Sequence, residues 1–330
     1  MFRPRRICAA LIVVLVLATT SLTYGSSAAA AKDAPLNKPI NVVMGTASAV
    51  GGWYVLGGGV CQVIQKHIPG LTATPQVTGG SIENVRLLAN KEVELIMVGA
   101  GTAIAALRGD KPFTERYEGL MNGLFTFGAT AVHLVVRSGS NFNSLNDLKG
   151  KKVAIGPPGS GTENVSRKIL AAAGLDKSIK AMPMGFNDMY DALKDGNVDA
   201  FVLEASPPGP ALEELARTSG IKLIRLDDNL LDQIVTGDKA YYKGAIVAGT
   251  YSGVEYDVPT LFSASFVACR PDFPEEAAYR ITKAVFENIP ELIQVHASAK
   301  AIKLEGALYG IPVPVHPGAM KYYSEVKGQK

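Results

Sequence analysis

The sequence predicts an α/β protein built as two lobes. Short β-branched runs alternate along the chain with segments of helical periodicity, a pattern typical of strand–helix units with largely parallel sheets. The chain has 330 residues, of which 47% are hydrophobic, enough for a larger core than one small domain needs. Turns rich in glycine and small hydroxyl residues follow several of the expected strands.

Residues 1–31 have the features of a secretory signal peptide. Three arginines within the first six residues precede an apolar run from Ile7 to Ala18, and small residues follow it. The run is shorter than the roughly 20 residues that a membrane span needs. We therefore predict export with cleavage near Ala30 or Ala31, and an uncleaved anchor stays open as the alternative.

Charge and cysteine content narrow the class of protein. The formal charge is +3, and removal of the three N-terminal arginines leaves 3 − 3 = 0, which gives no basis for a nucleic-acid partner. Cys61 and Cys269 remain in the mature chain. In an exported protein they could form a disulfide, or they could be two separate buried thiols.

Nine elements can be placed from local patterns. Strands are expected over residues 40–46, 93–98, 133–137, 152–155, 200–203 and 222–226. Helices are expected where apolar residues recur at helical spacing, over residues 82–89, 165–172 and 274–289, with Pro274 near the first turn of the last one.

The turns between these strands and helices are the candidate binding surfaces, because ligands of open α/β sheets lie outside the carboxyl ends of the strands. Three such turns, over residues 45–54, 78–81 and 156–163, are rich in glycine and serine or threonine. Each one places unpaired backbone N–H groups at a helix start, where they and the helix dipole attract an anion.

The turn after residue 155 fails the tests for catalytic loops. Gly156 and Gly161 have the spacing of a phosphate loop, but Thr162 and Glu163 follow where lysine and a hydroxyl residue should stand. A nucleophile elbow is also absent, because Pro158 stands two residues before Ser160. Ser160 and Glu163 fit a capping box, which by itself would account for the turn.

No catalytic or metal-binding constellation is expected. The four histidines, His67, His133, His296 and His316, are scattered without ligand spacing, and neither HExxH nor CxxC occurs. We therefore predict no enzyme activity, no cofactor and no metal. The histidines are expected to be surface or packing residues, with His133, at the start of a strand that could cross between lobes, the one to examine.

A series of ordered motifs carries a family resemblance. They include Gly51-Gly52-Trp53-Tyr54 and the segments 78–88, 132–137, 144–153, 156–163, 249–251, 257–260 and 312–319. In this order they resemble the TAXI family, the solute-binding subunits of one branch of tripartite ATP-independent periplasmic (TRAP) transporters. The match runs from about Ile40 to the C-terminus.

The resemblance implies a two-lobe periplasmic binding protein fold of type II-like topology, in which two α/β domains are joined by two hinge strands. Lobe 1 is expected to comprise residues 32–133 with 249–330, and lobe 2 residues 134–248. The chain is expected to cross near residues 133–137 and to return near residues 245–250. Closure of the lobes would enclose the ligand.

The function implied by the resemblance is that of an extracytoplasmic solute receptor, a periplasmic monomer that delivers its solute to the membrane subunits of a TRAP transporter. The solute is expected to be a small carboxylate, either a glutamate-like amino acid or a C5 dicarboxylate such as 2-oxoglutarate. A periplasmic ligand sensor that feeds a signalling kinase stays open as the alternative.

Matching the motifs residue by residue gives a candidate ligand site: Gly51, Trp53, Tyr54, Ser81, Asn84, Gly99 and Ala100 from lobe 1, and Ser160, Gly161, Thr162, Glu204, Ala205 and Ser206 from lobe 2. Tyr54 could donate its hydroxyl group to a carboxylate or be a half-buried core residue. Trp53 could wall the pocket or pack between turns.

The sequence departs from the family at two of these turns. Gly99-Ala100-Gly101-Thr102 stands where the family has a polar turn, so side-chain contacts expected there are lost. Glu204 stands where small uncharged residues are usual. Facing the cleft, its carboxylate would favour an amino acid over a keto acid, because an unpaired buried charge is costly. If Glu204 instead faced solvent or a lysine, both an amino acid and a keto acid would remain possible ligands.

Overall fold

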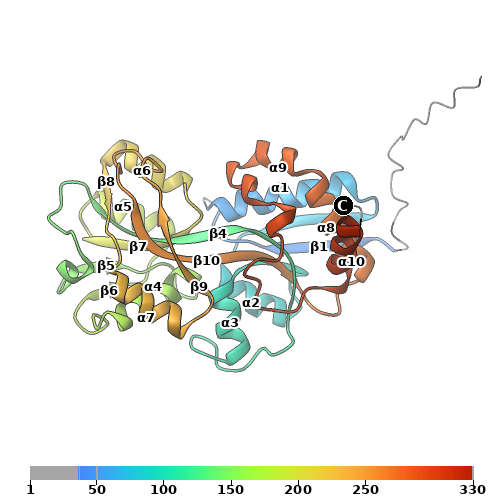
Figure 1. Cartoon of the computed structure of the whole chain (residues 1–330), viewed down its shortest axis with the longest axis horizontal. Helices are drawn as coiled ribbons and strands as arrows, with labels where there is room; N and C mark the ends of the chain where they lie inside the picture. Colours follow the sequence, from blue (N-terminus) through green and yellow to red (C-terminus); the bar gives the residue numbers. More distant parts are fainter. Residues whose placement is uncertain (1–35, 37, 50, 329–330) are drawn as a thin grey trace, which may run out of the picture. The chain divides into compact units, whose positions relative to one another are not determined.

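The structure is a computed structural model that describes residues 36, 38–49 and 51–328 (Figure 1). The predicted signal peptide and its cleavage site lie outside the described residues. Within these residues, no helix combines the length and the apolar character needed to cross a membrane.

The strands of the described residues form one ten-stranded sheet of order β2-β1-β3-β10-β4-β7-β5-β6, with β8 beside β4 and β9 beside β10. The strands are β1 (Ile40–Gly45), β2 (Leu71–Gln76), β3 (Leu95–Gly99), β4 (Asn122–Arg137), β5 (Lys152–Ala154), β6 (Lys180–Met182), β7 (Ala200–Ala205), β8 (Ile221–Leu223), β9 (Tyr241–Ile246) and β10 (Val258–Cys269). Each of the six expected strands overlaps one of them. Alternating strands and helices confirm the predicted α/β class.

Helices pack against this sheet in both lobes (Figure 1). They are α1 (Gly52–His67), α2 (Ser81–Ala89), α3 (Ala100–Arg108), α4 (Gly161–Ala172), α5 (Phe186–Lys194), α6 (Pro210–Ser219), α7 (Asp228–Gly237), α8 (Glu275–Glu287), α9 (Ile289–Val295) and α10 (Pro317–Gly328), with 3-10 helices η1 (Leu145–Leu148), η2 (Ala297–Ala301) and η3 (Leu304–Gly306). The three expected helices correspond to α2, α4 and α8. The last expected helix is too long, because α8 ends at Glu287, Asn288 is non-helical, and a new helix begins at Ile289 with Pro290 in its first turn.

The strand directions divide the sheet into two lobes. In lobe 1, β2, β1 and β3 are parallel, and in lobe 2, β7, β5 and β6 are parallel. The strands between them, β4 and β10, pair antiparallel with each other and with both groups. The expectation of a largely parallel sheet is therefore wrong for the middle of the sheet, because β4 leads from lobe 1 to lobe 2 and β10 leads back.

These two long strands are the connections between the lobes, and they run side by side in Figure 1. The first part of β4 pairs with β10, and its last part, from Ala131 to Val136, which includes His133, pairs with β7. The return was expected near residues 245–250 but lies in β10. Gly249 and Gly253 adopt positive φ and turn the chain, so β9 and β10 form an antiparallel pair instead.

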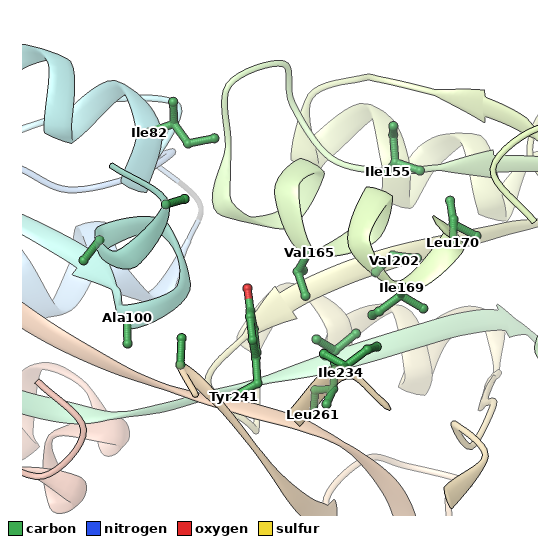
Figure 2. Close-up of a cluster of buried hydrophobic side chains, with 14 of the residues drawn as sticks. Ile82, Ala100, Ile155, Val165, Ile169, Leu170, Val202, Ile234, Tyr241 and Leu261 are labelled. Atoms are coloured by element: carbon green, nitrogen blue, oxygen red, sulfur yellow. The ribbon is translucent and has the colours of Figure 1, made fainter. Parts of the chain in front are cut away.

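The apolar core continues from one lobe into the other. One cluster joins side chains of α2 and α3, such as Ile82 and Ala100, to side chains of α4, such as Val165 and Ile169. Tyr241 of β9 belongs to the same cluster, and Figure 2 shows its ring standing among them. The lobes are thus joined by packed side chains as well as by the two strands.

The two cysteines, Cys61 of α1 and Cys269 of β10, lie in a second core cluster, which also includes side chains of β1, β2 and α8. Both are free thiols and both are buried. Burial raises the pKa of the Cys61 thiol to about 12, which keeps it in the unreactive thiol form. Of the two alternatives left by the sequence, separate buried thiols is the one that the structure contains.

Candidate functional site

A cavity with about 100 Å³ of free space lies where the glycine-rich turns of the two lobes meet. Its lining comes from both lobes and from β4 between them. The lining residues are Ala47, Ser48, Gly51, Gly52, Trp53, Leu56, Gly79, Gly80, Ser81, Thr130, Ser160, Gly161, Thr162, Phe186, Tyr190, Leu203, Glu204, Ala205, Ser206, Gly209, Pro210, Ala211, His296 and Ser298.

The cavity brings together nine of the thirteen residues in the predicted ligand site. They are Gly51, Trp53, Ser81, Ser160, Gly161, Thr162, Glu204, Ala205 and Ser206. Tyr54, Asn84, Gly99 and Ala100 do not line it. Whether the nine residues bind a solute stays a prediction.

Asn84 is a structural residue rather than a lining one. Its side chain is fully buried, and its Nδ2 donates hydrogen bonds to the carbonyl oxygens of Gly45, Thr46 and Met97 at 2.7–3.2 Å. Its Oδ1 accepts the hydroxyl proton of Thr78 at 2.7 Å. With both ends of the amide occupied, Asn84 ties β1 and β3 to α2 and has no group left for a ligand.

The other three residues lie beside the cavity without reaching it. The Gly99 amide donates to the Ser81 hydroxyl oxygen at 3.1 Å, so Ser81 rather than Gly99 presents a polar group to the cavity. Ala100 is buried at the start of α3. Tyr54 follows Trp53 on α1 but is not among the lining residues.

Three helices begin at the cavity with free amide donors. The first amides of α1, α2 and α4, those of Gly52, Ser81 and Gly161, have no hydrogen-bond partner among the described residues. No lysine or arginine is among the described lining residues. The groups that attract an anion are therefore backbone amides and helix dipoles, and not basic side chains.

The start of α4 is held in place by the capping pair that the sequence predicts. The Ser160 hydroxyl oxygen accepts the Glu163 amide at 3.1 Å. The Glu163 carboxylate reaches back to the amide of Gly159, at 2.8 Å, rather than to that of Ser160. The amides of Gly161 and Thr162 remain directed to the cavity end of the helix.

Glu204 is the acidic group of the cavity. Its Oε1 accepts the Thr130 hydroxyl at 3.0 Å, and its Oε2 lies so near Gly161 that a Cβ on that glycine would be 3.2 Å away. Lys168 pairs with Asp238 instead. Burial raises the pKa of the Glu204 carboxyl, against the opposing effects of the Thr130 hydrogen bond and the Lys168 charge. Of the two orientations left open by the sequence, Glu204 has the one that faces the cavity.

The other turn that differs from the TAXI motifs, Gly99 to Thr102, has a packing explanation. The hydroxyl group of Tyr241, from the other lobe, sits against Gly101, where any side chain would collide with the tyrosine ring. Burial, followed by the negative charge of Glu204, raises the pKa of Tyr241. Gly101 therefore leaves room for a buried tyrosine in place of polar side chains.

Trp53 combines the two roles that the sequence left open. It lines the cavity, and its ring meets Phe127 edge to face at a centroid distance of 5.3 Å. Nine further lining residues lie outside the turns and strands that the sequence predicts: Leu56, Thr130, Phe186, Tyr190, Gly209, Pro210, Ala211, His296 and Ser298. They lie inside strands or helices, or far along the chain from the glycine-rich turns.

A buried chain of hydrogen bonds connects β4 to the cavity. His133 is fully buried, and burial lowers its pKa to about 4, so its ring is neutral at pH 7. Its Nδ1 lies 3.0 Å from the carbonyl oxygen of Ala131 and donates to it, which leaves Nε2 to accept the Tyr251 hydroxyl at 2.9 Å. The Tyr251 oxygen in turn accepts the amide of the lining residue Gly209 at 2.9 Å.

We expect replacement of Tyr251 by phenylalanine to loosen the cavity loop. The change leaves His133 Nε2 and the Gly209 amide without partners, at an expected cost of about 2 kcal/mol in the free energy of unfolding. Hydrogen exchange at the Gly209 amide should become about tenfold faster or more. Denaturant unfolding and amide exchange by NMR measure the two effects.

Tyr256 provides the matched control. Its hydroxyl group donates to the Leu223 carbonyl and accepts the Leu223 amide, away from the cavity lining. Tyr256→Phe should lower stability without changing exchange at Gly209. Equal protection of Gly209 in both variants would contradict the role given to Tyr251.

The fold is shared with solved structures of low sequence identity. A protein of Listeria monocytogenes assigned to an L-cystine ABC transporter matches with a TM-score of 0.50 and 16% identity, over 80% of this chain and 98% of that one. A protein of Bordetella bronchiseptica matches with a TM-score of 0.50 and 17% identity, over 86% of this chain and 82% of that one. These similarities confirm the predicted two-lobe, type II-like fold of solute-binding proteins.

The family of this chain is shown by the match of its sequence to a protein-family model. The model of the NMT1-like family matches residues 44–327, which include both lobes and every described lining residue of the cavity. This chain belongs to the NMT1-like family.

Proposed function

We propose that this protein is an extracytoplasmic solute receptor of a TAXI-type TRAP transporter, which binds a small carboxylate in the cavity and delivers it to the membrane subunits. The observation that carries the proposal is the cavity between the lobes, with free helix-start amides from both lobes and one carboxylate. Amides from two lobes that contact one anion would stabilise the lobes around it.

The position of Glu204 supports an α-amino acid as the solute. The amides of Ser81 and Gly161 can donate to its carboxylate, while Glu204 can accept hydrogen bonds from its ammonium group. A keto acid or dicarboxylate would instead bring a second negative group or a carbonyl oxygen to Glu204. The solute class therefore narrows from carboxylates in general to a small amino acid, glutamate-like in size.

The membrane partner and the boundaries of the lobes are part of the same proposal. The ordered motifs of the TAXI family support a TRAP permease, and the basic and apolar start of the chain supports a periplasmic location. We propose lobe 1 as residues 32–133 with 249–330, and lobe 2 as residues 134–248. Tyr251 and Val254 pack in the core of lobe 2, which supports moving the second boundary to the start of β10.

Titration calorimetry tests the proposal directly. We expect the mature protein to bind at least one amino acid of a panel with a Kd in the micromolar range or below, roughly −8 kcal/mol or more favourable. The matching keto acid and C5 dicarboxylates should bind more weakly. Mass spectrometry of small molecules that co-purify identifies a solute that the panel lacks.

Two results would contradict the proposal. The absence of binding to the panel, together with the absence of a co-purified solute, would remove the receptor function. Uptake in cells that stops when ATP is depleted but ion gradients are kept would contradict the TRAP partner and favour an ABC transporter.

A further inference from the structure

His296 is a lining residue that the proposed amino-acid site does not use. It follows α9 directly, and both it and Ser298 of η2 line the cavity from lobe 1. The acidic group Glu204 and the hydroxyl group of Ser81 belong to another part of the lining, beside Gly161. His296 is thus a polar lining group to which the proposed site assigns no contact with the solute.

Hydrogen bonds at Nδ1 determine which ring nitrogen of His296 carries the proton. The Ser298 amide donates to Nδ1 at 3.2 Å, and the Ser298 hydroxyl group lies 2.7 Å from the same nitrogen. A backbone amide can only donate, so Nδ1 carries no proton. Burial lowers the pKa of His296, which favours the neutral ring at pH 7. The single proton of that ring is therefore on Nε2.

Nε2 is free to meet a ligand. It has no hydrogen-bond partner among the described residues. It lies beside Gly52, the first residue of α1, where an added Cβ would be 3.3 Å from both Nε2 and Cε1. Glycine at position 52 therefore makes room for the ring, and the Nε2–H group lies near the free first amide of α1.

We propose that His296 is a specificity-determining residue, whose Nε2–H donates to an acceptor oxygen at the end of the solute remote from Glu204. This inference rests on the proposed function, because it assigns the second end of the same amino acid. It selects amino acids whose side chain ends in a carboxylate or an amide over those whose side chain ends in a methyl group. The donor is neutral, so both oxygen types fit.

The test compares three probes of similar length, L-glutamate, L-glutamine and L-norvaline, by titration calorimetry on the mature protein. The wild type should bind glutamate and glutamine at least about tenfold more tightly than norvaline, the effect of one hydrogen bond to a buried donor. His296→Leu should remove that preference and leave the affinity for norvaline within about twofold. His296→Gln, which keeps a donor, should recover part of the preference.

His67→Leu is the matched control, because His67 pairs with Glu291 and is not a lining residue. It should leave all three affinities unchanged. In addition, ¹⁵N NMR of the wild-type imidazole should show the Nε2–H tautomer, a result that needs no variant to fold.

The outcomes separate the two proposals. If the wild type binds the probes but His296→Leu keeps the preference, or if the ring is the Nδ1–H tautomer, the inference about His296 is overturned and the receptor function stands. If the wild type binds none of the three probes, the amino-acid proposal itself fails, and the inference fails with it.

Discussion

Replacement of Glu204 by glutamine is expected to lower the affinity for α-amino acids about 100-fold and to make the corresponding keto acid the better ligand. The loss corresponds to roughly 2.7 kcal/mol, within the range for removing one partner of a buried, hydrogen-bonded charge pair. Glutamine keeps an oxygen that can accept the Thr130 hydroxyl, so the geometry of the loop should persist. Titration calorimetry with amino acid and keto acid pairs measures the reversal.

The same variant should be at least as stable as the wild type when no solute is bound. Burial raises the pKa of Glu204, so the folded protein binds this proton more tightly than the unfolded chain does. The wild type therefore loses stability as the pH rises from the ordinary carboxyl pKa through the raised one, and glutamine does not. Thermal unfolding between about pH 4 and pH 8 should show this difference, largest at the upper end.

Glu83→Gln removes an equal charge beside the cavity-lining turn at Gly79 and serves as the control. Glu83 lies in the first turn of α2, is exposed and does not line the cavity. Its carboxylate accepts the amide of the lining residue Gly79 at 2.6 Å, a hydrogen bond that the glutamine oxygen can keep. Its replacement should change amino-acid affinity by less than about twofold, because charges in water are screened. An equal loss in both variants would indicate a general field effect and would count against contact between Glu204 and the ammonium group.

Replacement of Asn84 by aspartate is expected to destabilise the fold by about 4 kcal/mol at neutral pH. The variant has nearly the same volume, but it leaves three buried carbonyl oxygens facing a carboxylate oxygen instead of an N–H donor. Each unsatisfied buried group costs about 1–3 kcal/mol, and a buried unpaired charge adds to this. Such a loss is a large part of the 5–15 kcal/mol typical of a folded domain. Denaturant unfolding measures it.

Asn41→Asp is the matched control for this change. Asn41 is exposed, and its Oδ1 accepts the Thr72 hydroxyl, a contact that aspartate can keep. We expect its free energy of unfolding to change by no more than about 0.5 kcal/mol. A small effect of Asn84→Asp, similar to the control, would show that Asn84 does not join β1, β3 and α2 as its hydrogen bonds indicate.

The glycine-rich turns were predictable from sequence because their signal is local. A predicted strand, a glycine- and hydroxyl-rich turn and a helix stripe follow one another within about twenty residues at α4. At α1 the strand and the turn were predicted, and at α2 the turn and the helix. The same local patterns placed six strands and three helices. The strands β2, β6, β9 and β10 were not predicted, since β6 is only three residues long and β10 reads as alternating small and apolar residues without clear bounds.

The roles of individual site residues were less predictable, because they depend on partners far along the chain. Asn84 and Ser81 lie three residues apart in one motif, yet only Ser81 reaches the cavity. The buried side of α2 directs Asn84 to the ends of β1 and β3, which no local pattern shows. His296 joins the cavity from a segment more than 200 residues away from Gly52, the glycine that its ring lies beside.

The sequence alone determined the α/β class, the helix starts with free amides that attract an anion, and the family resemblance. Each of these depends on residues that are neighbours along the chain. Only the tertiary structure decided that β10 is the return strand, that the cysteines are separate buried thiols, and that Glu204 faces the cavity. The physical reason is that these properties depend on long-range pairing of β4 with β10 and on packing between lobes. Such contacts join residues more than a hundred positions apart, where local periodicity carries no information.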